Sequence, residues 1–394
     1  MAKSPGSVVV LFNALSEEGY DELKHVDPTT LGFEPEYDIA VSTVSEEYQA
    51  IVKALRSEGW KVRSVNLKDD LKVLERVVKR NPPDVVFNLV ESFRDEPEFE
   101  SAIPAFLDLY GVPYSGATPL SLSICRRKGL TKRILQSHGV PTPKFLSLWE
   151  PKVSLRHGLK YPLIVKPARE DASAGLDAGS VVTDRTALLA RLEHMLHEFG
   201  GPVLVEEFIE GRELHVAMLG NDPPEILPPL EYDFSELPEG EPPIISYAAK
   251  WNPLAEVFHR VITRCPAPMS RTLQRRLIKA CLGAWNAVGC RDYARLDIRV
   301  SKKDEPYVLE VNPNPDLTEG VSFMESAEEV GLTFPGTMTR ILEMAKARKS
   351  VWPPPPPAGD EPKPVEMGPM GPLGSLAPRD QGPGVRDQAL TPDP

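Results

Sequence analysis

Charged and amide side chains recur near the C-terminal end on two segments that alternate polar and apolar residues. The first segment carries Arg295 and Asp297, and the second, after a polar turn, carries Glu310 and Asn312. Alternation with a period of two is typical of paired strands, so a hairpin would bring the polar faces of both segments together. Two carboxylates and an amide oxygen beside an arginine form a hard-oxygen site suited to Mg²⁺ carrying a nucleotide phosphate. A β-hairpin with a merely charged solvent face is the alternative interpretation.

Lys166 ends a predicted strand and precedes a loop of small residues that includes Ser173 and Gly175. Such a loop lets backbone N–H groups approach phosphate oxygens, while the lysine supplies a point charge. The loop does not match the Walker A pattern, and an ordinary turn is the alternative.

A third segment leads from a strand into a short connector and ends at Glu213. Backbone groups and a carboxylate at such a connector can contact the edge of an adenine, and Glu213 lies at a spacing suited to ribose hydroxyls. A charged turn that ends in a glycine is the alternative.

Composition limits the class of protein. The chain has 394 residues, enough for two or three domains, and its net charge of -12 disfavours nucleic acid or an anionic membrane as a partner. The four cysteines form no CxxC pair, and no apolar run approaches the length of a membrane span. We therefore expect a soluble cytoplasmic protein.

The first part of the chain, residues 1–122, alternates predicted strands with predicted helices. We expect strands at residues 8–12, 60–65 and 84–88, and helices at residues 45–57, 71–79 and 98–110, with Ser45 as the N-cap of the first helix. This alternation indicates an α/β domain with an open parallel sheet.

Two smaller units are expected to follow, a mixed α/β unit at residues 123–210 and an α+β unit at residues 211–348. The patterns predict helices at residues 123–137, 186–199 and 271–288, and strands at residues 163–167, 181–182 and 203–206. A Pro- and Glu-rich excursion begins at Asn221, and the region up to His259 is a candidate lid; an ordinary surface insertion is the alternative.

Residues 349–394 differ in character, because five prolines follow Trp352 and no aliphatic pattern remains. Such a segment cannot bury enough apolar area to offset its chain entropy, so we predict a disordered Pro-rich tail. A polyproline II ligand for an SH3-like partner is the alternative.

Taken together, these segments resemble the ATP-grasp superfamily and, within it, the D-alanine–D-alanine ligases. The resemblance covers roughly residues 5 to 345 and rests on segments that occur in the family's order. They are Gly111-Val112-Pro113-Tyr114-Ser115-Gly116, Lys128 to Lys132, Gly139-Val140-Pro141-Thr142-Pro143, Val165-Lys166-Pro167, Glu206 to Glu213, Arg295-Leu296-Asp297 and Glu310-Val311-Asn312. The combination is specific, whereas each segment alone is not.

The resemblance implies a three-domain ATP-grasp architecture that binds ATP and Mg²⁺, with Mn²⁺ as the alternative metal. It also implies site residues. Lys128 and Lys166 would bind phosphates under a loop that contains Ser173 and Gly175. The adenine pocket would be lined by Glu206, Phe208 and Ile209, and Glu213 would hold the ribose. The metal would be held by Asp297, Glu310 and Asn312, while Lys250 of the lid and Arg295 would act in catalysis.

The chain departs from the D-alanine–D-alanine ligase pattern on the amino-acid side. The family's N-terminal glutamate is missing from residues 39–45, and Glu46 and Glu47 lie on the following helix. Glu91 and Glu96 are the candidates to receive an amine, and a solvated loop acid is the alternative for each. Asp316 replaces the glycine whose N–H helps form the oxyanion hole, and its carboxylate would favour a cationic second substrate.

Two smaller departures concern residues beside the phosphates. Ala172 replaces the first of two serines, and Trp251 replaces the tyrosine after the lid lysine.

We therefore expect an ADP-forming carboxylate–amine ligase that joins an amino acid or small peptide to an amine through an acyl phosphate. A D-alanine–D-alanine ligase proper is the first alternative. A non-catalytic nucleotide-binding protein that acts through its tail is the second. The resemblance also implies a homodimer.

Overall fold

The computed structural model describes residues 4–14, 32–35, 43–154 and 156–348. All of them belong to one compact unit, Met1–Pro354. The predicted tail at residues 349–394 lies outside the described residues, as do most of the residues between the first strand and the first helix.

The N-terminal sheet is parallel, as predicted, and has the strand order β2-β1-β3. Its strands are β1 (Ser7–Phe12), β2 (Lys61–Asn66) and β3 (Val85–Asn88). The helices that follow the strands are α2 (Val44–Ser57), α3 (Leu71–Arg80) and α4 (Ala102–Leu109), the last preceded by the 3-10 helix η2 (Pro97–Ser101). The sheet's hydrophobic residues pack on both faces, so helices cover it on each side.

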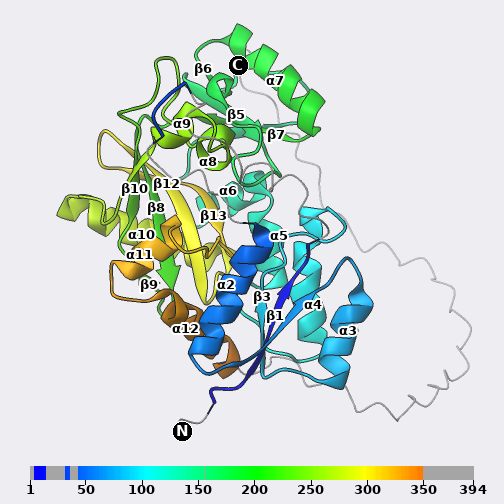
Figure 1. Ribbon diagram of the computed structural model, residues 1–394. Helices are drawn as coiled ribbons and strands as arrows, with labels where there is room; N and C mark the ends of the chain where they lie inside the picture. Colours follow the sequence, from blue (N-terminus) through cyan, green and yellow to red (C-terminus); the bar gives the residue numbers. More distant parts are fainter. Residues whose placement is uncertain (1–3, 15–31, 36–42, 155, 349–394) are drawn as a thin grey trace, which may run out of the picture. The chain divides into compact units, whose positions relative to one another are not determined.

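Helix α2 shares one face of this sheet with a helix from the far end of the chain, α12 (Phe334–Ala347). Helices α3 and α4 cover the other face (Figure 1). Residues that the sequence separates by almost three hundred positions therefore build one core. For example, Leu55 and Ile341 both belong to it.

Three helices differ from the prediction at a boundary. Thr43, rather than Ser45, is the N-cap of α2. The Glu46 N–H donates to the Thr43 hydroxyl oxygen, and the Thr43 N–H donates to the Glu46 carboxylate. The helix expected at residues 123–137 is two helices, α5 (Pro119–Cys125) and α6 (Lys128–Ser137). The break falls at Arg127, whose ψ of 81° is not helical. The helix expected at residues 98–110 likewise begins as η2.

The second sheet has the order β4-β7-β5-β6 and is antiparallel. Its members are β4 (Phe145–Leu148), β5 (Leu163–Pro167), β6 (Val181–Val182) and β7 (Val203–Glu207). Helix α7 (Arg185–Phe199) packs on it through Leu188, Leu192 and Met195. The short 3-10 helix η3 (Ala178–Ser180) precedes β6.

The third sheet contains the predicted hairpin. Its path is β11-β10-β8-β12-β13, with β9 attached to β8, and its strands are β8 (Gly211–Leu219), β9 (Glu225–Ile226), β10 (Leu230–Asp233), β11 (Ile262–Arg264), β12 (Tyr293–Ser301) and β13 (Pro306–Asn312). Helix α10 (Arg271–Val288) covers one face. The described residues also form the helices α8 (Tyr247–Trp251), α9 (Glu256–His259) and α11 (Ser322–Glu328).

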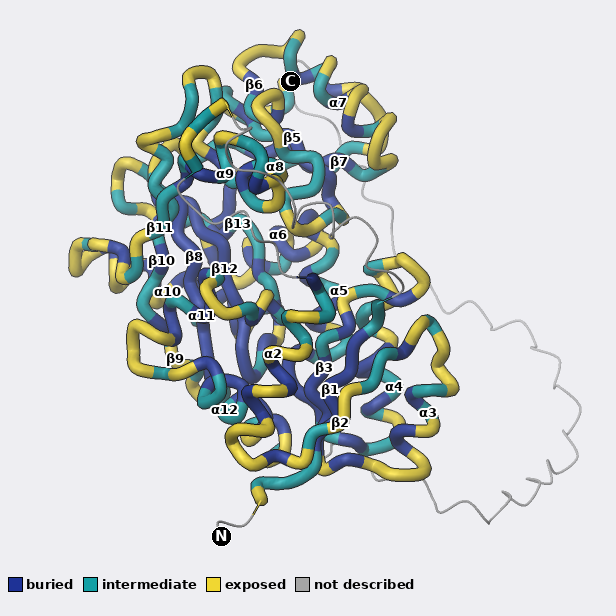
Figure 2. The backbone as a smooth tube through the Cα atoms, in the orientation of Figure 1, coloured by how far each residue is buried: buried dark blue, intermediate teal, exposed yellow. Residues whose placement is uncertain are grey.

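The central strands of the sheets are buried, whereas the edge strands β2, β4 and β11 contain no buried residue, and many connecting loops are exposed (Figure 2). All four cysteines are free thiols, which agrees with the absence of a disulfide pattern. None of the helices in the described part of the chain has the length and apolar content needed to span a membrane. The domain boundaries at residues 122, 210 and 348 stay predictions.

Candidate active site

The β12–β13 hairpin brings its four predicted residues together. The antiparallel register places Arg295 opposite Asn312 and Asp297 opposite Glu310. Arg295 donates from Nε to Asp297 Oδ1 at 2.7 Å and from Nη2 to Oδ2 at 3.0 Å. The Asn312 amide donates to Asp297 Oδ2 at 3.1 Å. The polar face is therefore a connected cluster, which a merely solvated hairpin would not need.

The donor set of this cluster fits a magnesium ion. Asp297 and Glu310 supply carboxylates, and the amide oxygen of Asn312 remains available because the nitrogen makes the contact to Asp297. Among the described residues no three His, Cys, Asp or Glu side chains gather at a possible metal site, and the set on the hairpin consists of two carboxylates and one amide. Mg²⁺ commonly takes only one or two protein carboxylates and retains waters.

Glu310 stays ionised in this setting. Burial by itself would raise the pKa of its carboxyl. The ammonium of Lys128, with Nζ 3.4 Å from Oε2, outweighs this effect, so the pKa of Glu310 lies below its ordinary value. The carboxylate is therefore available as a metal ligand at neutral pH.

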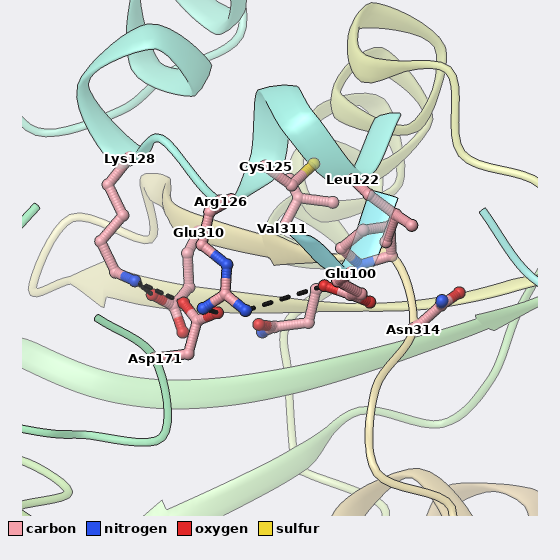
Figure 3. Close-up of a pocket in the computed structure, with 11 residues that line it drawn as sticks. Glu100, Leu122, Cys125, Arg126, Lys128, Asp171, Glu310, Val311 and Asn314 are labelled. Atoms are coloured by element: carbon pink, nitrogen blue, oxygen red, sulfur yellow. Dashed lines mark hydrogen bonds and ion pairs between the residues drawn. The ribbon is translucent and has the colours of Figure 1, made fainter. Parts of the chain in front are cut away.

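Lys128 lies at the start of α6, where the chain turns between two helices. Its Nζ donates to the Glu170 carbonyl at 2.5 Å and to Asp171 Oδ1 at 2.8 Å, in addition to its ion pair with Glu310. Burial alone would lower the pKa of Lys128, but the charges of Glu310 and Asp171 raise it. Figure 3 shows this lysine and Glu310 lining one pocket with Arg126 and Asp171.

The small-residue loop after β5 adopts left-handed backbone conformations. Ala172 and Ser173 have φ values of 54° and 62°, and Gly175 has a φ of 74°. A Cβ at Gly175 would lie 2.9 Å from Pro167 Cγ and 3.0 Å from the ring of Phe199, so this position requires glycine.

Helix α8, from the predicted lid region, is docked on this loop. Trp251 Nε1 donates to the Ala172 carbonyl at 2.8 Å, and the Tyr247 N–H donates to the Leu176 carbonyl at 2.9 Å. Between them lies Lys250, whose pKa is lowered by burial and by the charge of Arg295. The loop, Lys250 and the hairpin therefore lie around one region.

Lys166 and Glu206 belong to a buried ion-pair triad that also includes Lys132. Lys132 Nζ lies 2.8 Å from Glu206 Oε1, and Lys166 Nζ lies 3.2 Å from Oε2. Lys132 also donates to Thr142 Oγ1 at 2.8 Å, and burial lowers its pKa to about 8. The structure thus places Glu206 beside the predicted phosphate lysine, where it balances two ammonium groups.

The predicted nucleoside residues meet an arginine that the sequence analysis did not include. Arg299 donates from Nη1 to Glu213 Oε2 at 2.9 Å and from Nε to the Ile209 carbonyl at 3.0 Å. Its guanidinium also lies 4.8 Å from the centroid of the Phe208 ring. The sequence could have indicated Arg299, because it continues the alternating polar positions of Arg295 and Asp297 along the same strand.

His215 is a second residue that the sequence analysis did not include. It lies on β8, directly opposite Asp297 on the side away from β13, with Nε2 3.5 Å from Asp297 Oδ1. Its Nδ1 lies 3.1 Å from Ser322 Oγ. Burial and the charges of Arg295 and Lys250 hold its pKa well below the usual value, so the ring is neutral. A neutral ring therefore lies beside the Asp297 carboxylate and adds no charge to the cluster.

Three carboxylates whose roles the sequence left open are electrostatically coupled. Burial, followed by the charges of Asp316 and Glu91, raises the pKa of Glu47 to about 7. Burial and Asp316 also raise the pKa of Glu91. None of the three is in an ion pair within the part of the chain that the structure describes. Glu46 instead caps α2. The three carboxylates would favour a cationic group beside them.

The raised pKa of Glu47 predicts a pH-dependent stability. The folded protein holds this proton up to about pH 7, whereas the unfolded chain releases it near the ordinary glutamate pKa of 4.5, so stability falls as pH rises across that interval. Glu47→Gln mimics the protonated form. We expect the variant to match wild type at pH 4.5 and to be more stable by roughly 1–2 kcal/mol above pH 7.

Urea unfolding at both pH values measures this difference. Glu58→Gln, an exposed carboxylate just past the same helix, is the matched control. An equal difference at pH 4.5 and pH 7.5 would contradict the raised pKa.

Comparison with known proteins places the chain in a family. Residues 134–343 match the family model for the D-ala D-ala ligase C-terminus. The chain is 30% identical over 305 residues to a D-alanine–D-alanine ligase of Desulforudis audaxviator, a match that covers 76% of this chain and 92% of that one. It is 35% identical over 306 residues to the uncharacterized protein y4sG of Sinorhizobium fredii, covering 76% of this chain and 87% of that one.

Solved structures agree on the fold. The D-alanine–D-alanine ligase of Bacillus anthracis complexed with ATP aligns with a TM-score of 0.64 at 21% identity, covering 86% of this chain and 97% of that one. The VanG D-Ala:D-Ser ligase of Enterococcus faecalis aligns with a TM-score of 0.62 at 18% identity, covering 86% and 99%. The architecture is thus the predicted ATP-grasp fold. With the family-model match and the curated relatives, these comparisons show that the chain belongs to the D-alanine–D-alanine ligase family of ATP-grasp carbon–nitrogen ligases.

Proposed function

We propose that the protein is a Mg²⁺- and ATP-dependent, ADP-forming ligase that joins a carboxylate to an amine. The observation that carries the proposal is the connected cluster of Arg295, Asp297, Glu310 and Asn312, with Lys128 paired to Glu310 at its edge. In the proposed reaction a carboxylate oxygen attacks the γ-phosphorus and ADP leaves. The amine nitrogen then attacks the acyl carbon, phosphate leaves, and the nitrogen loses a proton.

The side chains of this protein would act mainly by neutralising charge and aligning groups. Lys128 and Lys166 would hold phosphate oxygens, and Arg295 would face the transferring group and the developing oxyanion. When bound at Asp297, Glu310 and Asn312, magnesium would supply Lewis-acid neutralisation of the phosphates.

Water must be kept from the acyl phosphate, since hydrolysis would waste the nucleotide. The contact of α8 with the loop through Trp251 and Tyr247 supports a lid role for this segment. Lys250, carried by the same helix, would reach the phosphates only while this contact holds.

The residues expected to bind the amine substrate, Glu47, Glu91 and Asp316, favour an amine that differs from D-alanine. Asp316 carries a carboxylate where the family has a glycine, and this carboxylate would repel an anionic acceptor. The pKa values of Glu47 and Glu91 are raised by burial and by the charge of Asp316, so a cationic acceptor beside them would favour their ionised forms. A D-alanine–D-alanine ligase proper remains the second candidate, because the name of the Desulforudis audaxviator relative supports it directly.

A substrate screen tests the proposal. Purified protein with Mg·ATP is incubated with D-alanine, with mixed amino acids and dipeptides, and with diamines, while phosphate release and product masses are recorded. A new amide from a cationic acceptor supports the first candidate, and efficient formation of D-alanyl-D-alanine supports the second. Tight nucleotide binding without any product would oppose both and favour a binding protein.

A further inference from the structure

Two cations converge on a carboxylate that belongs to the loop after β5. Asp171 Oδ1 lies 2.8 Å from Lys128 Nζ, and Asp171 Oδ2 lies 2.6 Å from Arg126 Nη1. The two cations flank the break between α5 and α6, so this local backbone turn directs both side chains to the same place. In Figure 3 both point toward the Asp171 carboxylate.

The cations are fixed, whereas the carboxylate is exposed. The side chains of Arg126 and Lys128 are 12% and 6% exposed, and that of Asp171 is 43% exposed. The Arg126 guanidinium makes two further contacts, with Nη2 3.7 Å from Glu100 Oε2 and 3.5 Å from the Pro97 carbonyl oxygen. The arrangement is a pair of largely buried cations that share one exposed carboxylate.

Lys128 cannot take a further anion while Asp171 remains. An ammonium has three N–H donors, and those of Lys128 face the Glu170 carbonyl, Asp171 and Glu310. Asp171 is the most exposed of these partners and the one on a small-residue loop. The same pocket is lined by Glu310 and Asn312 of the hairpin, so an anion held here would lie beside the proposed metal site.

We propose that Arg126 and Lys128 form a subsite for a terminal phosphoryl group of the bound nucleotide, and that Asp171 occupies this subsite in the nucleotide-free protein. The inference rests on the proposed function and adds two residues to it. Arg126 becomes a phosphoryl-binding residue, and Asp171 becomes an internal competitor. Nucleotide binding exchanges one carboxylate for one phosphoryl group at the same two cations.

Calorimetry with a non-hydrolysable ATP analogue and Mg²⁺ tests the exchange. We expect Asp171→Asn to lower the dissociation constant of the analogue by about tenfold, because the competing charge is lost. AMP, which lacks the distal phosphates, should bind wild type and the variant equally. Glu170→Gln removes the same charge from the neighbouring residue, which contacts Lys128 only through its backbone carbonyl, and should change neither constant.

Arg126 is tested in the Asp171→Asn background, where its pairing with the loop is already absent. Adding Arg126→Gln should raise the dissociation constant of the analogue by about tenfold and leave that of AMP unchanged. Arg126→Lys should recover part of the loss, and unchanged AMP binding shows that the variants are folded.

The outcomes separate the two proposals. Analogue binding to wild type with no change in Asp171→Asn would overturn the exchange while leaving the ligase function intact. An equal shift in Glu170→Gln, or an equal shift for AMP, would overturn it as well, because the effect would then be general electrostatics. Failure of wild type to bind the analogue in the presence of Mg²⁺ would overturn the proposed function itself.

Discussion

Glu310→Gln is expected to lower turnover by roughly a thousandfold or more while the fold persists. The variant keeps the shape of the side chain but removes one of the two carboxylates that face each other across the hairpin. It also removes the anionic partner that lies 3.4 Å from Lys128. Magnesium would then be held by Asp297 and Asn312 alone, so metal-linked nucleotide binding should weaken together with turnover.

Phosphate release and magnesium-dependent calorimetry measure the two effects, and circular dichroism checks the fold. Glu305→Gln is the matched control, because Glu305 is exposed in the turn of the same hairpin and its side chain accepts a bond from the Tyr307 hydroxyl. Wild-type turnover in Glu310→Gln would refute the metal assignment at this carboxylate.

Glu206→Gln is expected to cost about 3 kcal/mol or more of unfolding free energy at pH 7. The Glu206 and Lys132 side chains are both 0% exposed, and the carboxylate also pairs with Lys166. Removing its charge leaves two neighbouring ammonium groups with no buried anion between them. Burial already lowers the pKa of Lys132, and loss of the carboxylate should lower it further.

Urea unfolding with a shared slope measures this loss. Glu207→Gln is the control, because the next residue carries the same charge and its Oε1 accepts only a backbone N–H, that of Lys160, at 3.0 Å. The triple variant Lys132→Met, Lys166→Met, Glu206→Leu should recover much of the stability, since apolar side chains can replace a complete buried ion-pair triad. A loss below about 1 kcal/mol in the single variant would show that the triad is not a strong stabilising element.

Local elements could be predicted because their signals are local. The helix expected at residues 271–288 occurs with those bounds, and the parallel first sheet follows from the strand–helix alternation. The N-cap of α2 was misplaced because Ser45 and Thr43 carry equivalent signals, and only the reciprocal bond with Glu46 distinguishes them. The break before Lys128 was missed because an arginine at a helix end has no strong breaking signal.

The partners of the charged residues could not be predicted in the same way. His215 meets Asp297 only because β8 pairs with β12, and Arg299 meets Glu213 through the same pairing. Asp171 meets Arg126 because a loop after β5 folds back on the start of α6. Each contact joins residues far apart in the chain, and no periodic pattern reports such a distance.

The sequence by itself determined the chemistry of the two strands that build the hairpin, since alternation assigns Arg295, Asp297, Glu310 and Asn312 to facing positions. It also determined the family, because the motifs occur in a fixed order. Only the tertiary structure decided which charges neutralise one another, which of them are buried, and that α12 completes the N-terminal core. The reason is physical: side-chain periodicity is set by the local backbone, whereas burial and ion pairing depend on which distant segments pack together.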